Sequence, residues 1–270
     1  MIEVTDLRFG YESGPQIFDG LTVSIPAGET VAVLGANGTG KTTFLRLLAG
    51  LLEPTSGAIE IDGDGDGDSD GDRNGDGKGD DTREPVVGLT PETPADGLFA
   101  QTVEAEVAFF PENRGLPVDE HVERALTTLG IEDLADRQPH TLSQGEKRLV
   151  TIASVLSGDP DVIGLDEPTS GLDANGRRRL GDRVETLDRT VVLVTHDTDF
   201  AWRYADRVLV LTESGLEREG PTRDVLADPD FDPEGVGLRT PEPVRWARDH
   251  GVDPPTSVAE AVTLLEGGEK

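Results

Sequence analysis

A glycine-rich run near the N-terminus has the residue types and the spacing of a phosphate-binding loop. Residues 35–42 read Gly-Ala-Asn-Gly-Thr-Gly-Lys-Thr, which fits the pattern G-x-x-x-x-G-K-[ST]. The apolar, β-branched residues 30–34 predict a buried strand before it, and residues 43–50 predict a helix that ends at glycine. A strand, a glycine-rich loop and a helix start direct backbone N–H groups and the helix dipole at one point, where a highly charged anion fits.

The loop therefore predicts a nucleotide site in which single residues have separate tasks. Lys41 is expected to reach the β- and γ-phosphates, and the Thr42 hydroxyl to hold Mg²⁺. An ordinary glycine turn that matches by chance is the alternative, which the correct strand and helix on either side disfavour. The loop residues expected to contact the nucleotide are Gly35, Asn37, Gly38, Thr39, Gly40, Lys41, Thr42 and Thr43.

Two carboxylates follow a second predicted strand. The run of residues 162–165 is apolar or glycine and leads directly into Asp166 and Glu167. Asp166 is expected to hold Mg²⁺ directly or through a water molecule, and Glu167 to polarise the water that attacks the γ-phosphate. Adjacent acids at a strand end are common by chance. The assignment of this pair therefore depends on its order and distance relative to the glycine-rich loop.

Two shorter segments add polar groups that suit a phosphate. Ser143 and Gly145 precede a predicted helix, and a serine and a small residue at a helix start are a second phosphate-binding arrangement. The predicted strand 191–194 leads into His196, and a histidine at the end of a buried strand is able to touch the γ-phosphate. Because a lone histidine is usually structural, the order of the motifs carries this argument.

The composition restricts the classes of protein and of partner. A length of 270 residues allows one large domain, or one domain with a small appendage. The net charge of −30, from 54 acidic and 24 basic residues, opposes binding to nucleic acid and to anionic lipid. An acidic excess with only four lysines is typical of proteins from salt-loving organisms, with an acidic mesophilic protein as the alternative. In molar salt the Debye length is about 3 Å, which screens the repulsion between surface carboxylates.

Three further features bear on the location of the chain. The sequence contains no run of eighteen or more apolar residues, which predicts that it does not span a membrane. Residues 1–6 have neither the basic region nor the apolar core of a secretory signal. The absence of cysteine excludes disulfides, thiolate metal sites and a cysteine nucleophile, and is compatible with the cytoplasm.

Strands and helices alternate along most of the chain, which favours an α/β domain with a largely parallel sheet. Strands are predicted at residues 2–4, 21–25, 30–34, 86–89, 162–165, 191–194 and 208–211, with one more within 51–61. Helices are predicted at residues 43–50, 121–130, 150–156, 177–187, 244–250 and 257–265. Proline-rich turns enclose the last two helices and mark a small C-terminal appendage.

The tract of residues 62–81 consists almost entirely of glycine and aspartate. We predict a hydrated, disordered loop, because this composition cannot bury apolar surface. A calcium loop is the sharper alternative, with aspartate where the EF-hand pattern D-x-[DN]-x-[DN]-G-x5 has its final glutamate. The residues that fit are Asp70, Asp72, Asn74, Gly75 and Asp81. We favour the hydrated loop, since no amphipathic helices flank the tract. A tract rich in aspartate and glycine also matches the calcium-loop spacing easily by chance.

In this order, the motifs resemble those of the ATP-binding cassette (ABC) ATPases over residues 1 to about 220. The resemblance implies an α/β ABC ATPase fold, which is a RecA-like P-loop core with an antiparallel β subdomain and a helical subdomain. The ATPase domain would comprise residues 1–220, with the helical subdomain at about 92–155 and an insertion at 62–83, and residues 221–270 would be a C-terminal extension. In this family two cassettes pair head to tail around ATP.

The resemblance also assigns residues in this sequence. Ser143 and Gly145 look like the signature residues that contact the nucleotide held by the partner cassette, and Asp173 looks like part of the inter-subunit loop. Tyr11 looks like the aromatic residue that stacks on adenine, with Phe9 as the fallback. The implied ligands are ATP and Mg²⁺. The implied catalytic groups are Glu167, Lys41 and the switch histidine, His196.

The sequence departs from the family pattern at two places. The signature reads Leu-Ser-Gln-Gly-Glu in place of Leu-Ser-Gly-Gly-Gln, with Gln144 and Glu146 as the changed letters. The serine and the second glycine remain, so a working signature is expected. Glu92 stands where the family has a glutamine that ligates Mg²⁺. Glutamate could bind the metal too, but it adds a charge near the triphosphate, so we expect slower hydrolysis or a changed metal preference.

Residues 98–117 resemble the energy-coupling-factor subgroup, which powers the uptake of vitamins, such as biotin, and of cobalt or nickel. Its pattern has an aspartate ahead of the run V-A-F-G-P-E-N-x-G-L-P, and Glu106 and Phe110 replace the aspartate and the glycine. The implied partners are a second ABC ATPase, identical or a paralogue, an integral membrane coupling protein, and a substrate-binding membrane subunit. The surface near Glu92 and Phe99 would grip coupling helices of the membrane coupling protein. No nucleic acid is expected, and the chain would lie at the cytoplasmic face of the cell membrane. Core packing is the alternative for Phe99, Phe109 and Phe110.

Two other functional classes stay open. One is the ATPase of an ABC exporter, and the Pro-Glu-Asn-x-Gly-Leu-Pro run argues against it. The other is a soluble ABC ATPase that acts on DNA or ribosomes. DNA-repair members carry a coiled coil between the loop and the signature and translation members carry two cassettes, whereas this sequence has neither heptads nor a second cassette.

Overall fold

The structure is a computed structural model that describes residues 1–12, 14–62, 86–255 and 260. The glycine and aspartate tract lies outside the described residues from residue 63 onward, and with it all five residues of the calcium-loop alternative. The helix predicted at residues 257–265 also lies outside them, apart from Glu260.

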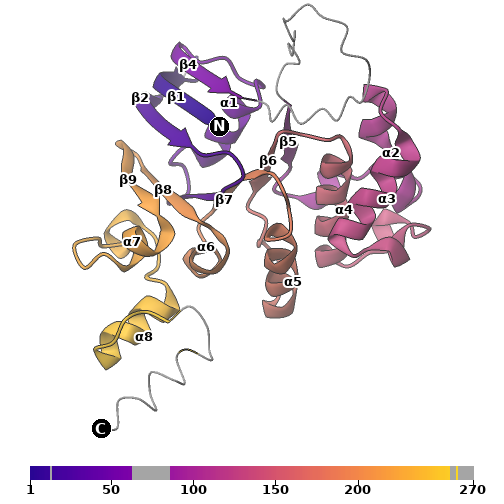
Figure 1. Ribbon diagram of the computed structural model, residues 1–270. Helices are drawn as coiled ribbons and strands as arrows, with labels where there is room; N and C mark the ends of the chain where they lie inside the picture. Colours follow the sequence, from indigo (N-terminus) through magenta and orange to yellow (C-terminus); the bar gives the residue numbers. More distant parts are fainter. Residues whose placement is uncertain (13, 63–85, 256–259, 261–270) are drawn as a thin grey trace, which may run out of the picture.

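The centre of the molecule is a six-stranded sheet (Figure 1). In sheet order its strands are β5 (Val87–Thr90), β6 (Val162–Asp166), β7 (Thr190–Thr195), β3 (Thr30–Leu34), β8 (Arg207–Thr212) and β9 (Gly215–Pro221). The first five are parallel, and β9 runs antiparallel to β8 at the edge. Every residue of β3, β6 and β7 is buried, as expected for parallel strands that are covered on both faces.

A smaller antiparallel sheet lies on one side of the central sheet (Figure 1). Its order is β2 (Gln16–Ile25), β1 (Ile2–Gly10) and β4 (Ser56–Ile61), with Val4 paired to Val23 on one side and to Ile59 on the other. Its inward side chains share one hydrophobic cluster with Phe44 of α1 (Lys41–Leu48) and with residues of the central sheet. The helix that follows the glycine-rich loop is therefore held between two sheets.

A bundle of three helices forms a separate lobe beside the central sheet (Figure 1). It consists of α2 (Val103–Arg114), α3 (Val118–Leu129) and α4 (Gln144–Ser157). Buried residues such as Val107, Leu126 and Val150 join this bundle to a second hydrophobic cluster, which reaches the central sheet. The 3₁₀ turns η1 (Pro94–Gly97), η2 (Glu132–Leu134) and η3 (Pro139–Thr141) connect its parts.

The remaining helices cover the sheet and continue toward the C-terminus. They are α5 (Ala174–Val184), α6 (Thr198–Tyr204), α7 (Thr222–Ala227) and α8 (Glu242–His250), with the 3₁₀ turn η4 (Glu234–Val236) between the last two. Phe231, Leu238 and Val244 belong to the cluster that includes the central sheet. The segment from α7 to α8 is thus packed against the part of the molecule that contains the central sheet.

The alternation of strands and helices predicted from the sequence is confirmed, but several bounds differ and some elements were not predicted. The helix predicted at 150–156 begins at Gln144 and ends at Ser157, and α2 was not predicted as a separate helix. The helix predicted at 177–187 was wrong by three residues at each end, because Asp173 accepts a hydrogen bond from the Gly176 N–H and starts the helix at Ala174. The short elements α6, α7 and β9 were not predicted. Helices of seven and six residues are too short to show a clear apolar period.

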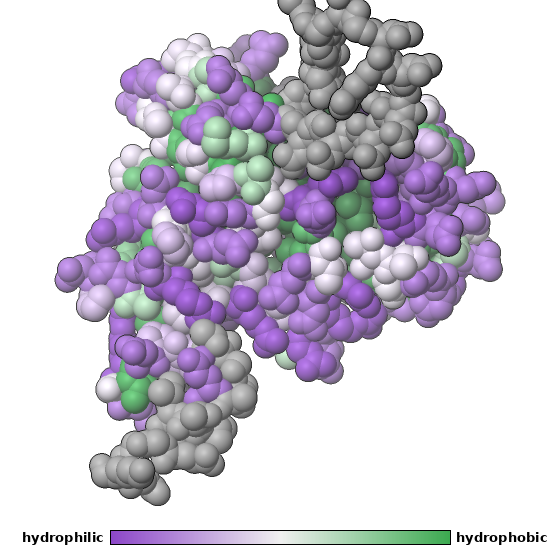
Figure 2. Space-filling model, in the orientation of Figure 1, coloured by the Kyte–Doolittle hydropathy of each residue, from purple (hydrophilic) through white to green (hydrophobic). Residues whose placement is uncertain are grey.

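Hydrophilic residues cover most of the face seen in Figure 2, as the charge of −30 requires. Within the ranges described above, no helix is both long and apolar enough to cross a membrane.

Candidate nucleotide site

The glycine-rich loop joins β3 to α1, and its shape depends on glycine. Gly40 precedes the first residue of α1 and has a φ of 93°, in the left-handed region that favours glycine. A Cβ atom at this position would also clash with Ile17. The loop can therefore close tightly against the start of β2 only because residue 40 has no side chain.

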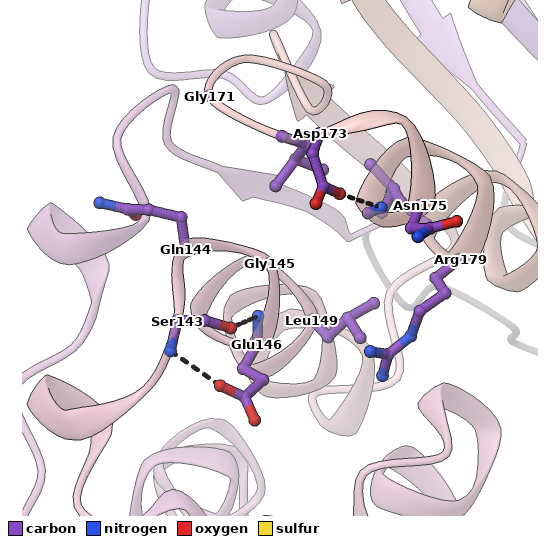
Figure 3. A pocket seen from close by; sticks show the side chains of 12 residues that line it. Ser143, Gln144, Gly145, Glu146, Leu149, Gly171, Asp173, Asn175 and Arg179 are labelled. Carbon is purple, nitrogen blue, oxygen red and sulfur yellow. Dashed lines mark hydrogen bonds between the residues drawn. The ribbon is translucent and has the colours of Figure 1, made fainter.

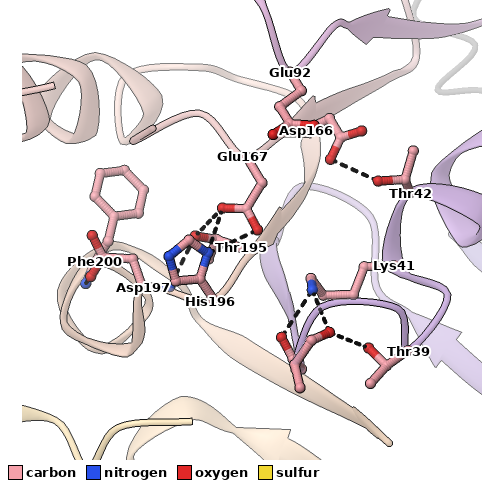
Figure 4. A network of polar contacts seen from close by, with 12 residues as sticks. Thr39, Lys41, Thr42, Glu92, Asp166, Glu167, Thr195, His196, Asp197 and Phe200 are labelled. Atoms are coloured by element: carbon pink, nitrogen blue, oxygen red, sulfur yellow. Dashed lines mark hydrogen bonds and ion pairs between the residues drawn. The ribbon is translucent and has the colours of Figure 1, made fainter. Parts of the chain in front are cut away.

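Lys41 is buried inside this loop. Its Nζ atom donates hydrogen bonds to the carbonyl oxygens of Gly35 and Ala36, both at 2.9 Å (Figure 4). Burial lowers the pKa of Lys41, and the nearby carboxylates of Glu167 and Asp166 oppose this shift. An ammonium group has three donors, and two are used here. The loop thus presents a desolvated cation with one donor left for a ligand.

Thr42 and Asp166 meet across the gap between α1 and β6. The Thr42 hydroxyl donates to Asp166 Oδ1 at 3.2 Å (Figure 4). Burial raises the pKa of Asp166, and the Thr42 hydrogen bond opposes this shift. A hydroxyl and a carboxylate oxygen are hard donors of the kind that Mg²⁺ prefers. The two side chains therefore fit the ion that the sequence predicted for them.

Glu167 directly follows β6 and has a φ of 43°, which is uncommon for a residue other than glycine. Its carboxylate accepts a hydrogen bond from the Thr195 hydroxyl at 3.3 Å and lies 3.1 Å from His196 Nδ1 (Figure 4). The Thr195 hydroxyl in turn accepts from the Asp197 N–H at 3.0 Å. The end of β7 thus orients the carboxylate that the end of β6 presents.

These groups surround one cavity of about 320 Å³, which we call the loop pocket. Its lining residues are Ile17, Asn37, Gly38, Gly40, Lys41, Thr42, Thr43, Glu92, Glu167, Ser170 and His196. Gly35 contributes the carbonyl that holds Lys41, and the Thr39 hydroxyl is turned inward to the Ala36 oxygen at 3.0 Å. The structure therefore brings together residues that the sequence placed in four separate motifs.

Ser143 and Gly145 lie at a different cavity of about 360 Å³, which we call the signature pocket (Figure 3). It shares no lining residue with the loop pocket. Its lining residues are Ser143, Gln144, Gly145, Glu146, Leu149, Gly171, Leu172, Asp173, Asn175, Gly176, Arg179 and Leu180. Within the described part of one chain, the signature residues and the phosphate loop are thus not neighbours.

The signature pocket contains the N-terminus of α4, which is capped by its own first turn. The Ser143 hydroxyl accepts from the Glu146 N–H at 3.3 Å, and the Glu146 carboxylate accepts from the Ser143 N–H at 2.7 Å (Figure 3). These hydrogen bonds with Ser143 lower the pKa of Glu146. This reciprocal cap explains how glutamate is accommodated at the last letter of the signature.

Tyr11, like Gly35 and Thr39, lines neither pocket, and Asp173 lines the signature pocket. Tyr11 is 44% exposed, and its hydroxyl lies 3.4 Å from the Thr43 hydroxyl. Phe9 is buried and packs edge to face against Tyr11, so only Tyr11 offers an open ring face. Asp173 lines the signature pocket, where its carboxylate caps α5 by accepting from the Gly176 N–H at 2.7 Å.

Sequence reasoning missed Arg148, the largest of the fully buried side chains. It lies on the second turn of α4, and its guanidinium donates to the carbonyl oxygens of Pro91 and Glu92 at 2.8 and 2.6 Å. The signal was present, because Arg148 precedes Ile152 and Val155 by four and seven residues and so shares their buried helix face. The contacts of Thr195 with Glu167 were missed as well.

A strand, a glycine-rich loop with a buried lysine, and paired acids at a neighbouring strand end define a P-loop nucleotide-binding protein. A family model described as ABC transporter matches residues 18–170, which is more than half of the chain. The chain therefore belongs to the ABC transporter family, and its fold is the ABC ATPase fold that the motifs implied.

Individual relatives agree with this assignment. A protein of Methanopyrus kandleri with the general name of ABC transporter ATP-binding protein is 41% identical over 265 residues, which cover 94% of each chain. The energy-coupling factor transporter ATP-binding protein of Methanocaldococcus jannaschii is 37% identical over 234 residues, or 84% of this chain and 81% of that protein.

Among solved structures, cbiO1 of Clostridium perfringens, part of the ABC transporter complex cbiONQ, superimposes with a TM-score of 0.72 and 30% identity. The superposition covers 92% of this chain and 98% of that chain. The chain is thus an ATP-binding subunit of an ABC transporter, an ATPase coupled to transport.

Proposed function

We propose that this chain hydrolyses ATP for an importer of the energy-coupling-factor type, which takes up a vitamin such as biotin, or cobalt or nickel. The relative from Methanocaldococcus jannaschii, whose name contains the term energy-coupling factor, supports the subgroup. The run of residues 98–117, with its Pro-Glu-Asn-x-Gly-Leu-Pro ending, supports it independently.

The observation that carries the proposal is an exposed cluster of three aromatic residues on the helical lobe. Phe99, Phe109 and Phe110 are 67%, 37% and 39% exposed. Their rings pack edge to face, with centroids 4.9 Å apart for Phe99 and Phe109 and 5.5 Å for Phe109 and Phe110. Exposed apolar groups that gather at one place mark an interaction surface. We infer that a short helix of the membrane coupling protein covers this cluster.

The position of Phe99 is held by a buried glutamate. Glu106 Oε2 accepts hydrogen bonds from the N–H groups of Phe99 and Ala100 at 2.8 and 2.7 Å, and the Glu106 side chain is buried. Glutamate is longer than the aspartate of the subgroup pattern and still reaches the backbone. Because these hydrogen bonds hold the loop in place, Phe99 can stay largely exposed, which suits a docking surface.

The loop pocket supports the proposed hydrolytic roles. Lys41 already donates to two loop carbonyls, and its third donor can meet a phosphate oxygen. Thr42 and Asp166 would hold Mg²⁺, which neutralises charge on the phosphates when bound. Glu167, oriented by Thr195 and His196, would accept the proton of the attacking water.

The signature pocket supports a two-subunit cycle. Because the signature residues do not reach the loop pocket of the same chain, we propose that Ser143 and Gly145 complete the loop pocket of a partner cassette, identical or paralogous. Binding of ATP by both subunits would close the pair, and hydrolysis would open it. The chain would act at the cytoplasmic face of the membrane, in a cell with high internal salt.

A gentle detergent pull-down in high salt, with mass spectrometry of the captured proteins, tests the importer function. We expect a transmembrane coupling protein and a small membrane subunit that binds the substrate. The variant Phe99→Ser should lose both, whereas Leu51→Ser should keep them, since Leu51 is also 67% exposed but follows α1.

The other outcomes of the same experiment separate the alternatives. Capture of an exporter subunit, of soluble proteins alone or of nucleic acid would contradict the importer proposal. Equal capture by the two variants would contradict the docking surface while leaving the importer function intact.

A further inference from the structure

Arg148 links the signature helix to the catalytic end of the central sheet. It belongs to α4, whose first residues line the signature pocket, and its side chain is 1% exposed. Charged side chains are almost never buried to this extent unless they are paired. The buried guanidinium therefore needs hydrogen-bond partners inside the protein.

Among the residues that the structure describes, the guanidinium of Arg148 bonds only to backbone carbonyls. Nη1 donates to Pro91 O at 2.8 Å, and Nη2 donates to Glu92 O at 2.6 Å and to Glu167 O at 3.3 Å. Pro91 and Glu92 follow β5, whereas Glu167 follows β6. One rigid group on the helical lobe thus connects the ends of two strands of the central sheet. Its Nε atom has no hydrogen-bond partner among the described residues, which adds to the cost of burial.

The charges around Arg148 explain why a cation is kept there. Burial lowers its pKa, but the carboxylates of Asp166, Glu92 and Glu167 oppose this shift. An arginine side chain is not deprotonated in proteins, so Arg148 stays charged despite its burial. It therefore supplies a permanent positive charge behind the acids of the loop pocket.

Among the residues that Arg148 contacts, Glu167 has the backbone that depends most on its neighbours. Its φ of 43° is a conformation that a side chain other than glycine disfavours, so neighbouring contacts must hold it. The Glu167 carbonyl accepts from the Ser170 N–H at 3.1 Å and from Arg148. The direction of the Glu167 side chain follows from this backbone, and a displacement of about 1 Å at a reacting group can cost about a hundredfold in rate.

We propose that Arg148 is a positioning residue for ATP hydrolysis, which couples the signature helix to the Glu92 loop and to the backbone of Glu167. A shift of the helical lobe would then move the Glu92 loop and change the support of Glu167 at the same time. This inference rests on the proposed role of Glu167 as the base. Arg148 itself does not line the loop pocket, and it acts through the backbone of Glu92 and Glu167, which do.

The test compares Arg148→Met, Arg148→Lys and Arg124→Met as full-length chains in high salt. Arg124 is a matched control, since it is an arginine on α3 of the same lobe that is 48% exposed and pairs with Asp159. We measure kcat and KM for ATP with Mg²⁺, the Kd for ATP without Mg²⁺, and the Mg²⁺ concentration at half-maximal rate. Arg148→Met should lower kcat by about ten- to a hundredfold, raise the required Mg²⁺, and leave the Mg²⁺-free Kd within about twofold.

The conservative variant separates positioning from folding. The lysine side chain of Arg148→Lys keeps the positive charge, but its ammonium group cannot donate to both carbonyls in the fixed geometry of a guanidinium. We therefore expect a kcat between those of the wild type and Arg148→Met. If Arg148→Met does not fold, a lower kcat of folded Arg148→Lys with an unchanged Mg²⁺-free Kd supports the inference. A wild-type kcat in either variant, or a kcat loss matched by Arg124→Met, would overturn it.

A parallel assay of Glu167→Gln separates the two proposals. Loss of hydrolysis in Glu167→Gln together with wild-type rates in both Arg148 variants would overturn only the positioning role. Wild-type hydrolysis by Glu167→Gln would overturn the base assignment and, with it, the route by which Arg148 is argued to act.

Discussion

The loop pocket and the signature pocket both lie at the N-terminus of a helix, α1 in one case and α4 in the other. In the loop pocket, a glycine without a side-chain cap precedes the helix, and Lys41, Glu92 and Glu167 line the cavity. In the signature pocket, Ser143 and Glu146 cap the helix with their own side chains.

This difference shows how one fold supports two kinds of phosphate contact. The loop pocket leaves charged groups and open N–H donors for a ligand and is equipped for chemistry. In the signature pocket the capping residues bond to each other, and the pocket offers a helix start, which suits recognition of a phosphate held elsewhere. The turn after Glu167 connects them, since Ser170 lines one pocket and Gly171 the other.

The largest effect should come from Glu167→Gln in the loop pocket. The amide cannot accept a proton from water, so kcat should fall by roughly 10²–10⁴-fold while ATP still binds. Phosphate release and equilibrium binding of ATP measure the two quantities. Unchanged phosphate release would show that another group is the base.

The next prediction compares one variant in each pocket. Lys41→Ala should weaken ATP binding by a dilute single chain about ten- to a hundredfold, because hydrogen bonds to charged groups contribute about 1.5–3 kcal/mol. Ser143→Ala should leave this affinity unchanged and lower only the ATPase rate, which in the wild type should rise with protein concentration. If Ser143→Ala weakened ATP binding by the dilute chain as much as Lys41→Ala, the separation of the pockets would be wrong.

A smaller effect is expected at Glu92, which lines the loop pocket and whose carbonyl accepts a hydrogen bond from Arg148 of α4. Glu92→Gln removes one negative charge from the loop pocket, so hydrolysis should become a few-fold faster, and its preference between Mg²⁺ and Mn²⁺ should change. Rates measured across a series of each metal test this. Identical rates and identical metal dependence would show that glutamate at position 92 changes neither hydrolysis nor metal preference.

The smallest effect belongs to Glu146→Gln in the signature pocket. Glutamine can keep the reciprocal cap, so the free energy of unfolding should change by less than about 0.5 kcal/mol at neutral pH. The folded-state pKa of Glu146 is lowered, so the stabilisation by its charge is present above the ordinary value of about 4.3 and is lost as pH falls through the folded pKa.

Urea unfolding at a series of pH values tests this last prediction. The difference between the wild type and Glu146→Gln should shrink below about pH 4. A difference that stays constant with pH would show that the charge of Glu146 contributes nothing to the cap.

The parts of the site that were predicted are contiguous in the chain. Residues 35–42 and the pair of Asp166 and Glu167 were found because a loop or a strand end is encoded by neighbouring residues. Arg148 was not found because its partners are 56 and 57 residues earlier and 19 residues later, so that only packing brings them together. The capping role of Glu146 was also not predicted, although its spacing from Ser143 is that of a capping box.

The sequence by itself determined the alternation of strands and helices, the family and the motifs that predict phosphate binding, because local backbone geometry and apolar periodicity depend on residues close in the chain. Only the tertiary structure decided which motifs share a pocket. Thr42 and Asp166 meet across 124 residues, whereas Ser143, closer to Asp166 in the chain, faces another cavity. The physical reason is that the buried central sheet aligns the ends of β3, β6 and β7, while α4 belongs to a lobe outside it.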